Sequence, residues 1–180
     1  MKSLTARQIT VKLFWDLRGA SQILIPRYTP RDWWECDLWR LTKSGYTDEY
    51  EIKLSVSDFK ADLSKSKRTF GGYNAETKKW IENYRVKHDE LQQGKGPNRF
   101  WYVVRSDMPE VAIPTYAGLM IVDGRAIYTK IAAPKLHSKK WDGDRLSVMT
   151  TFYHRYWTHE TASKEPEIDS YALDDTGREI

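Results

Sequence analysis

With 180 residues, 40% of them hydrophobic, the chain is long enough to form one compact domain with a packed core. Its net charge of +4 and two locally basic stretches, residues 60–105 and 125–145, suit a polyanionic partner and equally a solvated surface. No apolar run could span a bilayer, the N-terminus lacks the apolar core of a signal peptide, and the single Cys36 excludes an intrachain disulfide. We therefore expect a cytoplasmic protein without a membrane partner.

The first half of the chain predicts a helix followed by extended segments. In residues 4–18, apolar side chains recur at helical spacing. A short extended run follows at residues 23–25. Residues 34–41 and 46–54 each read as a strand, and the turn-forming sequence Lys43-Ser44-Gly45 between them predicts a hairpin.

The second half predicts further helices and strands. A helix capped by Ser57 is expected to run to Gly71-Gly72, and helical periodicity resumes over residues 76–93. The remaining predicted elements are strands at 99–104, 116–122 and 126–131 and a helix at 144–159. This order predicts an α/β fold, in which a central mixed sheet of four to five strands is flanked by helices. We expect one domain over residues 1–160 and an acidic, flexible tail over residues 161–180.

The predicted hairpin brings ionisable side chains together. Glu51 and Lys53 are two residues apart on one strand, so both point to the same face of the sheet. Folding about the turn places Asp37 opposite this stretch, and cross-strand neighbours have Cβ atoms roughly 4.5–5.5 Å apart. Two carboxylates and one ammonium are therefore expected at one point.

This combination suits phosphodiester hydrolysis. Two adjacent carboxylates repel each other unless a hard cation lies between them, and Mg²⁺ binds one or two carboxylates together with substrate phosphate. Asp37 and Glu51 are the candidate ligands, and the peptide carbonyl of Ile52 is a third. Lys53 is placed to orient or deprotonate the attacking water, or to neutralise charge in the transition state. The alternative is a cross-strand ion pair on a solvated face.

The ordered set of Asp37, a hairpin, Glu51-Ile52-Lys53 and a helix resembles the PD-(D/E)XK nuclease superfamily. The wider run from Glu35 to Arg68 is similar to MmcB-like DNA-repair nucleases and related phage proteins. So are the segments GPNRFWYVV, PTYAGLMIVDG and APKLH, and the similarity covers most of Glu35–His137.

The resemblance implies a restriction-endonuclease-like fold and Mg²⁺-dependent cleavage of DNA, with Mn²⁺ as a substitute. It also implies that Asp37 and Glu51 bind the metal and that Lys53 is catalytic. Many members carry a further Glu on the first helix, and here Gln8 takes that place. A neutral amide is a weak metal ligand, so this departure puts binding of a second metal ion in doubt.

Other side chains have both a functional and a structural interpretation. Ser55 and Asp58 either support the site or cap the following helix. A group of basic residues either contacts the DNA backbone or faces solvent, and consists of Lys60, Lys65, Lys67 and Arg68. His88 is expected to be exposed on a charged helix.

The sequence thus favours a Mg²⁺-dependent DNA endonuclease, acting in DNA repair, recombination or phage DNA processing. The alternatives are a catalytically weak or inactive DNA-binding module of the same fold, and an interaction protein that uses its aromatic surface. Enzymes that cut both strands are often homodimers, and the sequence shows no dimer seam that would decide this point.

Overall fold

The computed structural model describes residues 4–124 and 126–162, which fall into two compact units with their sequence boundary between Trp141 and Asp142. The first unit contains α1 (Ala6–Leu17), the 3-10 helix η1 (Arg18–Ala20), β1 (Ser21–Tyr28), β2 (Cys36–Thr42), β3 (Thr47–Lys53), α2 (Val56–Leu63), β4 (Ser66–Asn74), β5 (Lys79–Val86), α3 (Lys87–Gln92), β6 (Arg99–Arg105), β7 (Ala117–Val122) and β8 (Ile127–Ile131). The second contains α4 (Arg145–Ala162), a helix that we expected within the domain 1–160. Residues 163–180, most of the expected tail, lie outside the described residues. None of the described helices is long and apolar enough to cross a membrane.

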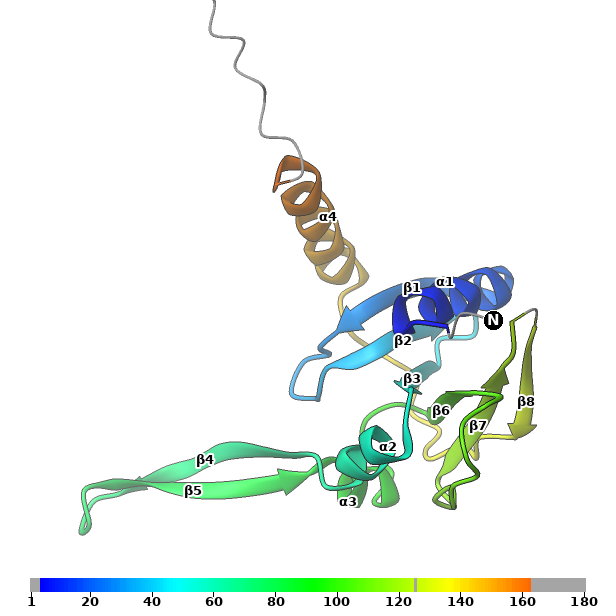
Figure 1. Cartoon of the computed structure of the whole chain (residues 1–180). Helices are drawn as coiled ribbons and strands as arrows, with labels where there is room; N and C mark the ends of the chain where they lie inside the picture. The colour runs from blue at the N-terminus through cyan, green and yellow to red at the C-terminus, as the bar shows by residue number, and fades with distance from the viewer. Residues whose placement is uncertain (1–3, 125, 163–180) are drawn as a thin grey trace, which may run out of the picture. The chain divides into compact units, whose positions relative to one another are not determined.

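A mixed sheet forms the centre of the first unit, which confirms the predicted α/β class (Figure 1). It has six strands in the order β1-β2-β3-β6-β7-β8, where four or five were expected. The first three strands are antiparallel neighbours, β3, β6 and β7 run parallel, and β8 returns antiparallel to β7. Because β3 has a strand on each side, it lies inside the sheet, and all seven of its residues are buried.

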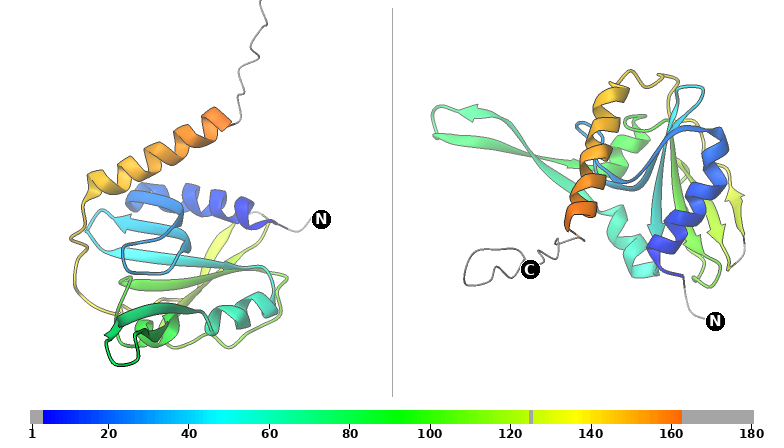
Figure 2. Two further views of the ribbon diagram at one scale, coloured as in Figure 1. Left: turned by 90° about the vertical axis from the view of Figure 1, so that its left-hand side faces the viewer. Right: turned by 90° about the horizontal axis from the view of Figure 1, so that it is seen from above.

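Helix α1 covers one face of the sheet (Figure 2). Its first turn is fixed by a capping box, in which the Thr5 hydroxyl accepts the Gln8 N–H and the Gln8 side chain accepts the Thr5 N–H. Ile9 and Leu13, four residues apart, are fully buried. They pack in a cluster of sheet residues that all point to this face, namely Leu38, Tyr50, Ile52, Val103, Met120 and Val122.

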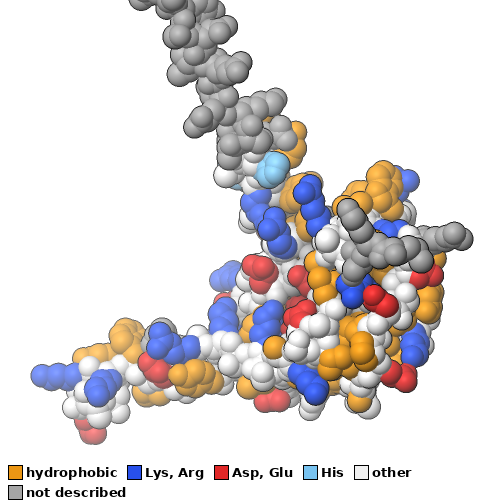
Figure 3. Space-filling model, in the orientation of Figure 1, with side chains coloured by type: hydrophobic (Ala, Val, Ile, Leu, Met, Phe, Trp, Pro, Cys, Tyr) orange, Lys and Arg blue, Asp and Glu red, His pale blue; other side chains and the backbone are white. Residues whose placement is uncertain are grey.

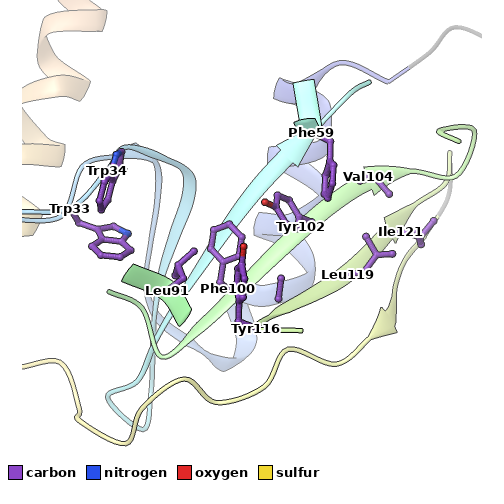
Figure 4. Close-up of a cluster of buried hydrophobic side chains, with 11 residues drawn as sticks. Trp33, Trp34, Phe59, Leu91, Phe100, Tyr102, Val104, Tyr116, Leu119 and Ile121 are labelled. Atoms are coloured by element: carbon purple, nitrogen blue, oxygen red, sulfur yellow. The ribbon is translucent and has the colours of Figure 1, made fainter. Parts of the chain in front are cut away.

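Helices α2 and α3 cover the opposite face through Phe59 and Leu91 (Figure 4). They pack there against the alternate residues of β6, Phe100, Tyr102 and Val104, because successive side chains of a strand point to opposite faces. Glu49, Glu51 and Lys53 of β3, which are buried, point to this same face. They are therefore enclosed between the sheet and the two short helices.

The segment between α2 and α3 corrects the sequence prediction. Residues 66–86 form an antiparallel hairpin of β4 and β5, which we call the arm, and between residues 66 and 93 only α3 is helical. In its turn, the Asn74 side chain accepts the backbone N–H groups of Glu76 and Thr77, both at 3.0 Å. The helical spacing of Trp80, Ile81 and Tyr84 was misleading, since aromatic and β-branched residues also favour strands.

Candidate functional site

The hairpin of β2 and β3 brings Asp37 beside Glu51, as predicted. The paired register between the two strands ends at Leu38 and Tyr50, and Asp37 and Glu51 are the next residues on each strand. Here a side-chain hydrogen bond takes the place of a backbone bond between the two strands. Asp37 Oδ2 accepts the Ile52 N–H at 2.7 Å. Burial, followed by the nearby negative charge of Glu51, raises the pKa of Asp37 above its ordinary value.

Lys53 lies on the same face as Glu51 and is enclosed by two carboxylates. Its Nζ donates to Glu51 Oε2 at 3.0 Å and to Asp62 Oδ1 at 2.9 Å, and only 5% of the residue is exposed. Burial opposes the charge on this ammonium, but the two carboxylates outweigh it and raise the pKa of Lys53. The amine therefore stays protonated at neutral pH.

Asp62, on α2, connects this network to side chains of β6 and α3. Its Oδ2 accepts the hydroxyl of Tyr102 at 3.0 Å and lies 3.1 Å from His88 Nε2, while the other nitrogen of His88 lies 2.7 Å from the Tyr116 hydroxyl. Burial opposes ionisation of Asp62, but the contacts from His88 and Lys53 outweigh it and lower the pKa of Asp62. The carboxylate is thus held ionised, and it fixes the position of Lys53.

Lys87 is a second buried ammonium, which joins Glu49 to Glu51. Its Nζ lies 2.5 Å from Oε1 of each, although the geometry at Glu49 Oε1 does not satisfy a hydrogen bond. Trp33 Nε1 donates to the other Glu49 oxygen at 2.7 Å. Burial still raises the pKa of Glu49, whereas for Glu51 the charges of Lys87 and Lys53 outweigh burial and lower the pKa. Isolated charges at this depth would be costly, and the pairing offsets that cost.

The network is most exposed to solvent at Asp37 and Lys65. Asp37 is half-buried, and 35% of the Lys65 side chain is exposed. Lys65 Nζ lies 3.7 Å from Glu51 Oε1, and it donates to the carbonyl of Glu35 at 3.1 Å. Its positive charge also acts on Asp37 and opposes the rise of that pKa. A partly exposed ammonium therefore lies where it neutralises both Asp37 and Glu51.

The oxygen-rich composition of this network is of the kind that a hard divalent cation prefers, but the side chains are arranged as ion pairs. The network contains four carboxylates against three ammonium groups, and consists of Asp37, Glu49, Glu51, Asp62, Lys53, Lys65 and Lys87. The acids thus exceed the lysines by one charge, and carboxylate and carbonyl oxygens are the ligands that Mg²⁺ takes. Over residues 4–124 and 126–162, no group of three or more His, Cys, Asp or Glu side chains is arranged to hold a metal ion. Both oxygens of Glu51 are contacted by lysines instead.

The remaining predicted site residues lie outside this network. The Gln8 side chain is bonded to Thr5 in the α1 capping box. Ser55 is the N-cap of α2 and accepts the Asp58 N–H at 3.1 Å, so the capping interpretation describes both residues. Lys60 is exposed on α2. Lys67 and Arg68 are exposed on the arm, where Arg68 pairs with Glu82 at 3.1 Å.

Sequence reasoning missed three residues of the network, Glu49, Asp62 and Lys87, and two residues that contact Asp62, His88 and Tyr102. For Glu49 a signal was present, because it lies two residues before Glu51 and shares its face. For Asp62 the signal was its spacing of three from the buried Phe59 on α2. The expectation that His88 is exposed was wrong, since it is buried against Asp62 and Tyr116.

Comparisons with known proteins show a related fold and no related function. No model of a protein family matches the chain, and no curated protein matches it. Among solved structures, the chain is similar to the SPO1766 protein of unknown function from Silicibacter pomeroyi, with a TM-score of 0.57 and 18% sequence identity. The match covers 93% of this chain and 96% of that chain. At this identity the likeness shows the fold alone.

Proposed function

We propose that the protein is a metal-dependent deoxyribonuclease of the PD-(D/E)XK type, with its active site at Asp37, Glu51 and Lys53. The observation that supports this best is the pair of carboxylates at the end of the β2–β3 ladder. Asp37 and Glu51 lie close enough for Glu51 to raise the pKa of Asp37, and the half-exposed Lys65 lies beside them. A divalent cation and a partly exposed ammonium are alternative ways to neutralise such a pair.

Each of the three residues has a distinct task in this proposal. Asp37 and Glu51 would hold Mg²⁺, or Mn²⁺ in its place, with the Ile52 carbonyl as a further ligand. When bound, the ion would polarise a phosphoryl oxygen and acidify its own water. Because Glu51 and Asp62 keep Lys53 protonated, its task is to stabilise negative charge on the phosphate, not to accept a proton from the water. The Ile52 N–H orients the Asp37 carboxylate.

A cleavage assay tests this proposal. Linear, nicked and branched DNA would be incubated with the wild-type chain in Mg²⁺, in Mn²⁺ and in EDTA. We expect metal-dependent cutting that falls by ~10²-fold or more in Asp37→Asn and in Lys53→Met. Lys43→Met, which changes an exposed lysine at the end of β2 away from Asp37, is the matched control and should retain wild-type activity. Cutting that persists in EDTA, or that survives Asp37→Asn, would contradict the proposal.

A second candidate is a DNA-binding module of the same fold that does not cut. Two observations favour it. The Lys53 ammonium is already paired with two carboxylates, and lysines contact both oxygens of Glu51. In this case the charges of the network stabilise the fold and the basic surface binds DNA. Salt-sensitive DNA binding by a folded wild-type chain, without cleavage in either metal, would identify this function.

A further inference from the structure

The arm begins and ends at the candidate site. Lys65 immediately precedes β4, and Lys87 immediately follows β5. The N–H of Lys87 donates to the carbonyl of Lys65 at 3.0 Å, which closes the base of the arm. The ammonium groups of both residues approach the same atom, Glu51 Oε1, at 3.7 Å for Lys65 and 2.5 Å for Lys87. A ligand held on the arm is therefore tethered to the two segments that contact Glu51.

One face of the arm carries three aromatic side chains. Tyr73 pairs with Trp80 across the hairpin, and Tyr84, four residues after Trp80 on β5, points to the same face. Exposed fractions are 54% for Tyr73, 61% for Trp80 and 66% for Tyr84. The rings of Tyr73 and Trp80 meet edge to face with centroids 5.6 Å apart, so they support each other without covering each other.

The arm is also positively charged. Between residues 66 and 86 it has five Lys or Arg against two Glu. The bases are Lys67, Arg68, Lys78, Lys79 and Arg85. Figure 3 shows that hydrophobic and basic side chains alternate along the arm. Exposed rings between basic groups combine stacking surfaces for bases with charges for phosphates.

We propose that the arm binds single-stranded DNA and leads it to Asp37 and Glu51, so that the substrate is DNA with a single-stranded segment. Aromatic rings can stack only on bases whose faces are accessible, and in a duplex those faces are already stacked. The choice of DNA as the nucleic acid rests on the proposed nuclease function. The choice of a single strand rests on Tyr73, Trp80 and Tyr84 alone.

Fluorescence anisotropy of a labelled oligothymidine tests the proposal with the full chain in EDTA, where metal-dependent cleavage cannot interfere. Trp80→Ala and Tyr84→Ala should each weaken binding by about 5-fold or more, the effect of losing one stacked base. Trp80→Phe keeps a ring and should bind nearly as the wild type does. The matched controls are Trp15→Ala on α1 and Tyr128→Ala on β8, whose side chains are 58% and 49% exposed. Both should bind oligothymidine as the wild type does.

The possible results distinguish failure of the arm proposal from failure of the nuclease proposal. Equal binding by the wild type and both arm variants would overturn the arm proposal, as would tighter binding of duplex DNA or of an oligouridine. Cleavage that depends on Asp37 would still stand in those cases. A further outcome is that the wild-type chain binds oligothymidine but cuts no DNA, while the arm variants lose this binding. That result would support the arm proposal and reject the nuclease proposal. Circular dichroism would establish that each variant is folded.

Discussion

Lys53 and Asp62 form a buried ion pair, with Nζ and Oδ1 2.9 Å apart. The pair joins the strand that carries the Glu-x-Lys sequence to the helix that covers it. Lys53 keeps a second carboxylate partner in Glu51, while Asp62 keeps Tyr102 and His88. Replacing Asp62 therefore removes one charge from a network that remains otherwise intact.

Asp62→Asn should destabilise the fold in a pH-dependent way. The folded-state pKa of Asp62 is lowered, so its ionised form stabilises the protein above the unfolded-state pKa, which is about 3.9. That contribution is lost as the pH falls through the folded-state pKa. Urea unfolding at pH 7 should show a loss on the order of 3 kcal/mol relative to wild type, and the loss should shrink below about pH 4. An equal loss at acidic and neutral pH would show that ionisation of Asp62 is not the cause. Asp107→Asn, at an exposed site, is the control.

Lys87→Met should be among the most destabilising changes to the network. It removes the ammonium shared by Glu49 and Glu51 and, among the described residues, leaves Trp33 as the remaining partner of the fully buried Glu49. Breaking a buried pair on one side costs about 3–5 kcal/mol. Adding Glu49→Gln to Lys87→Met removes the unpaired charge and should recover part of this loss in urea unfolding. A double variant that is no more stable than Lys87→Met would argue against charge as the source of the effect.

Lys65→Met should strengthen the binding of divalent cations. The Lys65 ammonium lies 3.7 Å from Glu51 Oε1 and competes with a cation for the same negative charge. Because Lys65 is partly exposed, the competition is worth no more than about 1 kcal/mol, which corresponds to an affinity gain of about two- to five-fold. Isothermal titration with Mn²⁺ would measure the gain, and Lys60→Met should bind as wild type does. Weaker binding in Lys65→Met would mean that this lysine assists the cation.

Asn98→Ala should destabilise the first unit without touching the ionised network. The Asn98 side chain accepts the Thr47 N–H at 2.8 Å and donates to the carbonyls of His137 and Lys139 at 3.0 and 2.8 Å. It thereby fixes the segment after β8 to the starts of β3 and β6. Each buried group left without a partner costs about 1–3 kcal/mol, so thermal unfolding should show a total loss of roughly 3 kcal/mol or more. Asn83→Ala, on the exposed arm, should have little effect.

Local chemistry allowed much of the structure to be predicted from the sequence. The β2–β3 hairpin follows from a turn at Gly45, where φ is +86°, between two strands of period two. The same periodicity places Glu51 and Lys53 on one face, and the antiparallel return brings Asp37 to them. Helix α1 and strands β6, β7 and β8 were also predicted near their observed positions, because their patterns are local.

Only the tertiary structure decided what surrounds those residues. Lys87 contacts Glu51 across 36 positions of the chain, and His88 reaches Asp62 across 26, because the arm closes on itself and returns the chain to its starting point. No local sequence pattern predicts that the two ends of the arm lie side by side. The spacing of Trp80, Ile81 and Tyr84 also fits a helix as well as a strand. The sequence by itself determined which groups share a strand face. The long-range packing of α2 and α3 determined that this face is buried, and hence that its charges had to be paired.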